Sequence, residues 1–341
     1  MSYGYTVQRN KKNITLNLRS EAGKRLLDEL ASKMDVIIHN NPKGTEEADL
    51  LNYERLSKIN PALIVVVYTG YGHASPFAER PCFDAIAQAM CGSMSFTGYP
   101  GTPPLKAGVP FVDFNSAARV ALGAMLALYE RKSSGKGQFV DIALFDVAFS
   151  MAGAMGCAAE YQLLGEVRKP VGNCGFYAYC VSSPAKDGYL MINVIGNSQW
   201  RRMCRLMKKE DLIKDPRFKD NLSRYRNYAA LDVVVGEWIK DMTVAEARKR
   251  LDDAGIPCGP VNDVPASLQE PQLAAREMLV ELDYPGTGKV PIPGITIKLS
   301  RTPGKVAKRA SLLGEDNENI YSQLLGYGPD DLLKLKQENA I

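Results

Sequence analysis

The sequence predicts an α/β fold with a large domain built on a parallel sheet, joined to a smaller α+β domain. In the first half of the chain, helical patterns alternate with short runs of continuous β-branched residues, as in βαβ units. After Pro170 the pattern changes to a hairpin signal followed by three amphipathic helices. The length of 341 residues suggests roughly two domains.

Composition narrows the class of protein. The hydrophobic share of 45% and the charged share of 23% are those of an ordinary globular chain. The net charge of +4 argues only weakly for a nucleic-acid partner, and no aromatic residues are interleaved with the basic clusters, so we expect none. The seven cysteines have irregular spacing, so we expect reduced thiols and a cytoplasmic location. The N-terminus is polar, and the apolar stretch Val147 to Ala159 is shorter than the roughly 20 residues of a membrane span. We therefore expect no membrane association.

The first elements follow from hydrophobic spacing and capping residues. Ser20 is a suitable N-cap, and three leucines after it form one apolar face. The predicted order is a helix over Ser20 to Met34, a strand over Asp35 to His39, a weaker helix over Tyr53 to Ile59 and a strand over Leu63 to Tyr68.

A second set of apolar segments continues the large domain. Its long central helix ends at a glycine suited to a C-cap, Gly135. We predict helices over Phe83 to Met90 and Ser116 to Arg131, a strand over Phe139 to Ile142, and one long buried helix over Ala143 to Leu164.

The smaller domain is predicted over 175–265. Strands over Phe176 to Val181 and Tyr189 to Val194 flank a turn at Lys186 to Gly188. Thr243 and Glu246 form a capping box for the last of three helices, near 198–208, 227–241 and 244–254. Beyond this domain we predict short strands over Met278 to Tyr284 and Ile295 to Leu299, then two helices.

Few residues suit nucleophilic chemistry. With only His39 and His73 in the sequence, a Ser-His-Asp triad or a histidine-rich metal site is improbable. Asp113 is the strongest candidate, because apolar residues flank it and a buried helix is predicted to begin two or three residues later. There its carboxylate would face free helix N–H groups, which favour ionisation. The alternative is that Asp113 only caps the helix.

Several sequence blocks, in a fixed order, resemble one family. They are 10–18 (NKKNITLNL), 80–92 (RPCFDAIAQAMCG), 97–98 (TG), Asp113, 134–141 (SGKGQFVD), 255–261 (GIPCGPV) and 275–278 (AREM). Together they resemble the class III CoA-transferases, a family that includes formyl-CoA and carnitine CoA-transferases and acyl-CoA racemases. The resemblance covers essentially the whole chain.

The resemblance implies a fold and a reaction. The fold would be a Rossmann-like large domain over 1–174, the small domain over 175–265, and a return to the large domain over 266–341, in an interlocked homodimer. The substrates would be an acyl-CoA thioester and a free carboxylic acid, with coenzyme A as the carried group and no metal. Asp113 matches the family's catalytic aspartate, which forms a mixed anhydride and then an aspartyl-CoA thioester.

By the same matching, three segments would contact coenzyme A: Leu16, Asn17, Leu18 and Arg19; Asn40, Asn41 and Pro42; and Pro81, Cys82, Phe83 and Asp84. Arg19 could instead be an exposed strand end, and Asn40 a turn residue. Phe83 could belong to the core, and Asp84 could be a structural acid at a helix N-terminus.

The chain also departs from the family pattern. Family members normally begin earlier, so we expect about one βαβ unit, of more than 30 residues in full, to lack its start here. The arginine that many members carry after Asn40 is Ala48 here, and the family's glycine-rich loop falls on 174–177, which is not glycine-rich. Formyl transfer is therefore less expected.

Two other functions compete with CoA transfer. The racemases of the family place a histidine beside the aspartate, and that position is Phe83 here. A non-catalytic CoA-binding subunit, completed by another polypeptide, is the second alternative.

Overall fold

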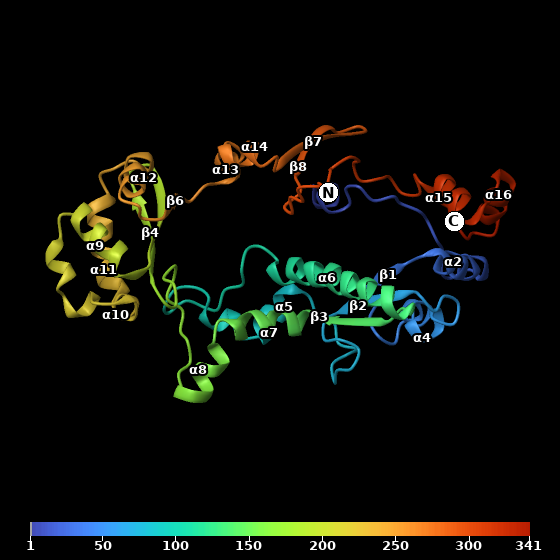
Figure 1. Cartoon of the computed structure of the whole chain (residues 1–341), viewed down its shortest axis with the longest axis horizontal. Coiled ribbons are helices and arrows are strands. Elements are labelled where there is room, and N and C mark those ends of the chain that lie inside the picture. The colour runs from blue at the N-terminus through green and yellow to red at the C-terminus, as the bar shows by residue number, and fades with distance from the viewer. Residues whose placement is uncertain (1) are drawn as a thin grey trace. The chain divides into compact units, whose positions relative to one another are not determined.

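The computed structural model describes residues 2–341, and the chain divides into two compact units (Figure 1). The first unit contains the residues up to Ser93, Ala107–Gly165 and Glu270–Ile341. The second contains Met94–Lys106 and Glu166–Gln269. Each unit has its own hydrophobic core and is described by itself.

A three-stranded parallel sheet forms the centre of the first unit, as predicted. Its order is β1 (Val36–His39), β2 (Ile64–Thr69) and β3 (Phe139–Ala143). The central strand β2 is almost wholly buried, which explains its unbroken run of apolar residues. The α/β fold class predicted from the sequence is confirmed.

Helices cover both faces of this sheet. On one face Ala31 of α2 (Glu21–Lys33) and Leu56 of α4 (Tyr53–Leu56) pack against β2. On the other, α6 (Phe111–Ser134) packs Val120 and Ala124 against β2 (Figure 1). The short helix α3 (Glu46–Leu50) precedes α4, and α1 (Ser2–Val7) opens the chain. The layers place the start of α6 at the carboxyl edge of the sheet.

The caps of α2 and α6 show which boundaries local sequence determines. The Ser20 hydroxyl accepts a hydrogen bond from the Gly23 N–H at 2.9 Å, so the predicted N-cap is confirmed. The end of α6 at left-handed Gly135 is also confirmed. Its predicted start at Ser116 is wrong, because the helix begins at Phe111 and Asp113 lies in its first turn.

The long buried helix predicted over Ala143 to Leu164 is wrong as well. The structure has α7 (Leu144–Ala154) and α8 (Cys157–Leu164), separated at Gly156, whose φ of 86° is left-handed and ends the helical path. Leu163 and Leu164 are exposed rather than buried. The remaining helical segments near the site are α5 (Asp84–Met90) and the 3-10 turn η1 (Ser93–Phe96).

The last part of the first unit is a hairpin and two helices. Strands β7 (Leu279–Tyr284) and β8 (Gly288–Pro293) pair with each other, so the strand expected over Ile295 to Leu299 is wrong. After α14 (Pro271–Ala275) and the hairpin, α15 (Asn317–Leu325) and α16 (Pro329–Gln337) share a core with α2.

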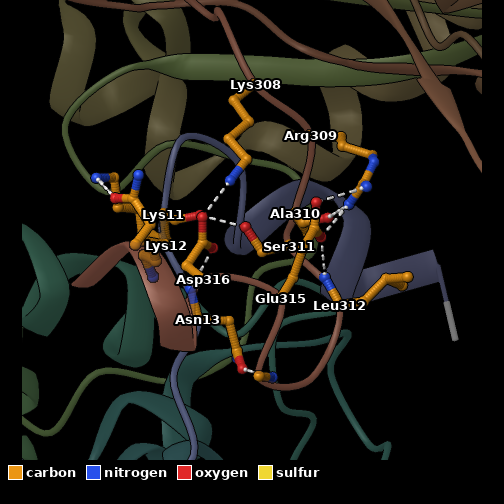
Figure 2. Close-up of polar contacts among 12 residues, drawn as sticks. Lys11, Lys12, Asn13, Lys308, Arg309, Ala310, Ser311, Leu312, Glu315 and Asp316 are labelled. Carbon is orange, nitrogen blue, oxygen red and sulfur yellow. Dashed lines mark hydrogen bonds and ion pairs between the residues drawn. The ribbon is translucent and has the colours of Figure 1, made fainter. Parts of the chain in front are cut away.

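Polar contacts bind the beginning of the chain to a distant segment (Figure 2). The Asp316 carboxylate accepts hydrogen bonds from the Asn13 backbone N–H at 2.8 Å and from Lys308 Nζ at 2.9 Å. Beside it, Arg309 makes two hydrogen bonds with the Glu315 carboxylate. These contacts fix the extended chain that leads into α2.

The second unit is an antiparallel sheet covered by helices. Strands β4 (Tyr179–Ala185) and β5 (Gly188–Val194) form the predicted hairpin, and β6 (Cys258–Pro260) pairs with β5. The capping box of Thr243 and Glu246 is confirmed. The helical segments are α9 (Gly196–Leu206), η2 (Glu210–Ile213), η3 (Pro216–Phe218), α10 (Asn221–Arg226), α11 (Tyr228–Ile239), α12 (Val244–Asp253) and α13 (Val264–Leu268).

By length and composition alone, α6 could cross a membrane. The core helix of an α/β layer passes the same test, and the inner face of α6 packs on β2. Its outward residues, among them Met125 and Tyr129, are more than half exposed. The exposed apolar face of α6 is therefore a surface feature of the first unit.

Candidate active site

Asp84 of α5 caps the N-terminus of α6 from outside that helix. Its Oδ2 accepts hydrogen bonds from the backbone N–H groups of Val112 at 2.8 Å and Asp113 at 3.2 Å. Pro110, the residue before α6, offers no side chain that could cap it. The Asp84 side chain is buried, so its charge is held beside the positive end of the α6 dipole.

Gln88, one turn further along α5, extends this cap. Its Nε2 donates to Asp84 Oδ1, and its Oε1 accepts from the Ala107 backbone N–H at 2.9 Å. Gln88 is only 1% exposed. One face of α5 thus fixes both the loop that approaches α6 and the first turn of that helix.

Asp113 sits in this first turn with its side chain exposed. The N–H groups that we expected it to face are already bound to Asp84. Although the side chain is exposed, partial desolvation by its neighbours raises the pKa of the Asp113 carboxyl above its ordinary value, and the negative charge of Asp84 raises it further. The expectation that helix N–H groups would favour ionisation of Asp113 is therefore wrong.

The segment before α5 lies against the same cluster. Phe83 is 76% exposed, which rules out the core position considered for it. Burial raises the pKa of the Cys82 thiol, and the negative charges of Asp113 and Asp84 raise it further. A Cβ on Gly70 would lie 2.3 Å from the Cys82 Cβ, so only glycine lets the segment approach the end of β2 this closely.

The segment Leu16 to Arg19 is anchored to the end of the chain. The Asn17 backbone N–H and side-chain amide donate to the carbonyls of Ala340 and Asn339, both at 2.8 Å. Leu16 packs in the core shared by α2, α15 and α16, while Arg19 is exposed. This segment does not belong to the hydrogen-bonded cluster around Asp84.

Asn40, Asn41 and Pro42 directly follow β1, at the carboxyl edge of the parallel sheet where α/β folds bind ligands. Asn40 and Pro42 are exposed. The Asn41 backbone N–H donates to Nδ1 of His39 at 3.3 Å. This segment, too, lies outside the Asp84 cluster.

Sequence reasoning missed Gln88 and Gly70. Gln88 follows Asp84 by four residues, so it lies on the same face of a short helix, and this spacing was the available signal. No local signal identifies Gly70, because its close neighbour comes from a different segment. Among residues 2–341, no three His, Cys, Asp or Glu side chains are grouped so that they could hold a metal ion.

The chain as a whole was compared with known families. The profile of CoA-transferase family III matches residues 2–317. The chain belongs to CoA-transferase family III. This confirms the resemblance drawn from the ordered sequence blocks, and it makes this chain a relative of enzymes that transfer coenzyme A.

Individual relatives of the family match over nearly the full chain. The succinyl-CoA–D-citramalate CoA-transferase of Chloroflexus aurantiacus is 32% identical over 335 residues, covering 98% of this chain and 83% of the relative. The succinyl-CoA:glutarate CoA-transferase of Mus musculus is 31% identical, covering 98% of this chain and 76% of the relative.

A solved structure supports the fold. The crystal structure of a CAIB/BAIF family protein from Brucella suis matches with a TM-score of 0.81 and 33% sequence identity. The match covers 94% of this chain and 84% of the other. The α/β architecture of this chain is therefore shared with a solved CAIB/BAIF family structure.

Proposed function

We propose that this protein moves coenzyme A from an acyl-CoA thioester to a free carboxylic acid, with Asp113 as the covalent nucleophile. One observation carries the proposal: the exposed Asp113 carboxylate lies in the first turn of α6, which the buried Asp84 carboxylate caps. Partial desolvation and the negative charge of Asp84 both raise the pKa of Asp113. A carboxylate of higher pKa is a better nucleophile once it is ionised.

The proposed reaction has four transfers of an acyl group. The Asp113 carboxylate attacks the thioester carbonyl and expels the CoA thiolate, which leaves a mixed anhydride. The thiolate attacks the Asp113 carbonyl of that anhydride, releases the donor acid and forms an aspartyl-CoA thioester. The acceptor carboxylate then displaces the thiolate to form a second anhydride. Attack of the thiolate on the acceptor carbonyl yields the new acyl-CoA and frees Asp113.

The Asp84 charge favours the covalent steps in this scheme. Two neighbouring carboxylates repel each other, and acylation of Asp113 removes one of the two charges. The Asp84 carboxylate is held in place by hydrogen bonds from the Val112 and Asp113 backbone N–H groups and from Gln88. The cap therefore acts on Asp113 both through position and through charge.

We propose that the three segments matched to the family contact coenzyme A. The exposed guanidinium of Arg19 is suited to a phosphate, and Phe83, the residue before Asp84, offers an exposed apolar surface. Asn40 to Pro42 follow a strand end, where backbone groups are available to a ligand.

We also propose a cytoplasmic homodimer. The outward face of α6 carries Leu122, Met125, Leu126 and Tyr129, which are 58%, 63%, 61% and 76% exposed. A contiguous apolar face of this kind is suited to burial against a second copy. We propose further that the domain boundaries lie near 174 and 265.

The substrates are best sought among those in the names of the relatives. Those names give succinyl-CoA as donor and D-citramalate or glutarate as acceptor. A Streptomyces coelicolor relative, 30% identical, is named a formyl-CoA:oxalate CoA-transferase. A panel of succinyl-CoA and formyl-CoA against dicarboxylic and hydroxy acids, followed by chromatography of the acyl-CoA products, tests the proposed reaction.

The matched variants are Asp113→Asn and Asp146→Asn. Asp146 is the third residue of α7, just as Asp113 is the third residue of α6. We expect Asp113→Asn to reduce turnover by at least about 10³-fold, because it removes the nucleophile, and Asp146→Asn to leave turnover unchanged. Equal activity of the two variants contradicts the proposal.

The same panel separates the competing functions. Racemisation requires a second acid–base group, and the hydrogen-bonded cluster of Asp84, Gln88 and Asp113 contributes no imidazole. Exchange of the α-proton of an acyl-CoA in deuterated water, without an acceptor acid, would indicate racemisation. Binding of coenzyme A without any transfer would indicate a non-catalytic subunit.

A further inference from the structure

Both histidines of the chain line one small cavity of about 170 Å³ in the first unit. His39 is the last residue of β1, and His73 lies in the loop after β2. Val67 of β2 and Phe139 of β3 line the cavity with them. The cavity therefore lies towards the carboxyl end of the sheet, next to the segment that follows β1.

The hydrogen bonds of His39 determine its neutral tautomer. The Asn41 backbone N–H donates to Nδ1 at 3.3 Å, so Nδ1 carries the lone pair and Nε2 carries the proton. Within the described chain, Nε2 is buried and has no hydrogen-bond partner of normal geometry. His39 is thus held as a neutral ring whose one clear hydrogen bond is to Asn41.

Protonation of His39 would break its hydrogen bond with Asn41. The proton adds to Nδ1, which turns an acceptor into a donor facing the N–H of Asn41. Two donors cannot share a hydrogen bond, so the segment Asn40 to Pro42 would lose its hydrogen bond to His39, the last residue of β1. The charged ring would also be buried in the cavity.

The groups around the cavity shift the protonation equilibrium of His39 in both directions. Burial lowers the pKa of His39, and a positive charge on His73 lowers it further, while the Leu51 backbone carbonyl has the opposite effect. Asp141 Oδ1 lies 4.0 Å from His73 Nδ1. The remaining polar groups are the Lys43 ammonium, which donates to the His73 carbonyl at 3.4 Å, and the Glu54 and Tyr53 side chains, which line the cavity.

We propose that His39 is a proton-sensitive latch on the segment Asn40 to Pro42, so that acidification releases this segment and weakens the binding of coenzyme A. The link to coenzyme A depends on the function proposed above. The latch itself depends only on the His39–Asn41 contact and the cavity. Since the folded-state pKa of His39 is lowered, the neutral, latched form prevails at neutral pH and persists below the ordinary histidine pKa of about 6.5, and it is lost only as the pH falls through the lowered pKa.

The first test is the dissociation constant of coenzyme A, measured by calorimetry from pH 8 to pH 5. His39→Asn is the informative variant, because its Oδ1 can accept from Asn41 and never titrates. In the wild type, affinity should fall by up to about tenfold per pH unit below the His39 pKa. In His39→Asn that fall should be absent, apart from the titration of the ligand's own phosphate near pH 6. Identical pH dependence in both proteins overturns the proposal.

The second test needs no coenzyme A. The Asn41 amide resonance of the wild type should titrate with the His39 ring, and His73→Gln should move its midpoint to higher pH by removing the neighbouring charge. An Asn41 amide that does not titrate overturns the latch, and an unchanged midpoint in His73→Gln overturns the coupling of the two rings. If coenzyme A fails to bind at pH 7.5, the proposed function fails, and the amide titration still decides the latch.

Discussion

Replacing Asp84 with asparagine separates the charge of the α6 cap from its hydrogen bonds. The asparagine Oδ1 can still accept from Val112 and Asp113, although its NH2 group then faces the Gln88 donor, and the negative charge beside Asp113 is gone. The pKa of Asp113 should then fall, because Asp84 is one of the two causes that raise it. Activity requires ionised Asp113, so the acid limb of kcat/KM should move to lower pH.

Replacement of Asp84 with alanine removes the hydrogen bonds as well. Loss of an N-cap costs about 1 kcal/mol, and the N–H of fully buried Val112 would be left unsatisfied at a further cost of about 1–3 kcal/mol. We therefore expect Asp84→Ala to reduce the free energy of unfolding by about 2–4 kcal/mol and Asp84→Asn to reduce it by about 1 kcal/mol.

The assays are urea unfolding and the pH profile of kcat/KM from pH 4 to pH 8. The reasoning is refuted if Asp84→Ala is as stable as the wild type, since the cap would then carry no energy. It is refuted equally if the acid limb of Asp84→Asn coincides with that of the wild type. In that case the Asp84 charge would not act on Asp113.

Three further perturbations test other parts of the structure. Gly70→Ala places a Cβ 2.3 Å from that of Cys82 and should lower the free energy of unfolding by about 1–3 kcal/mol, as measured in urea, and also reduce kcat. Gly153→Ala, with open space around its Cβ in α7, is the control and should be neutral or stabilising. Leu126→Lys on the exposed face of α6 should convert the proposed dimer to monomers in light scattering, and a mass equal to that of the wild type contradicts that interface. The pKa of Asp316 is held below its ordinary value by its ion pair and its backbone hydrogen bond (Figure 2), so its stabilisation is present above about pH 4 and lost as the pH falls. Asp316→Asn should therefore lower the melting temperature at pH 7 and flatten its decline towards pH 3.

Elements controlled by neighbouring residues could be predicted from the sequence. The strand at Leu63 to Tyr68 follows from its own apolar run, and the Ser20 cap and the Thr243 capping box each act within four residues. The hairpin of the second unit follows from a local turn at Asp187. Each of these signals lies inside the element that it defines.

The start of α6 could not be predicted in this way. Its capping group, Asp84, is 28 residues earlier in the chain than Val112, so nothing local replaces the missing cap at Pro110. The break at Gly156 depends on a backbone angle, and the exposure of Phe83 depends on tertiary packing. Asp113 was singled out by its apolar flanks and then by the ordered family blocks, and Asp84 by those blocks alone. The catalytic role of Asp113, the CoA-contacting segments and the domain boundaries remain predictions.

The central claim is that the Asp113 carboxylate becomes covalently acylated during transfer. Trypsin cleavage at Lys106 and Arg119 releases 107–119, in which Asp113 is the sole acidic residue. After incubation with succinyl-CoA and hydroxylamine, we expect mass spectrometry to show a hydroxamate on that peptide. A protein that binds coenzyme A and turns over, yet leaves this peptide unmodified, would contradict the account.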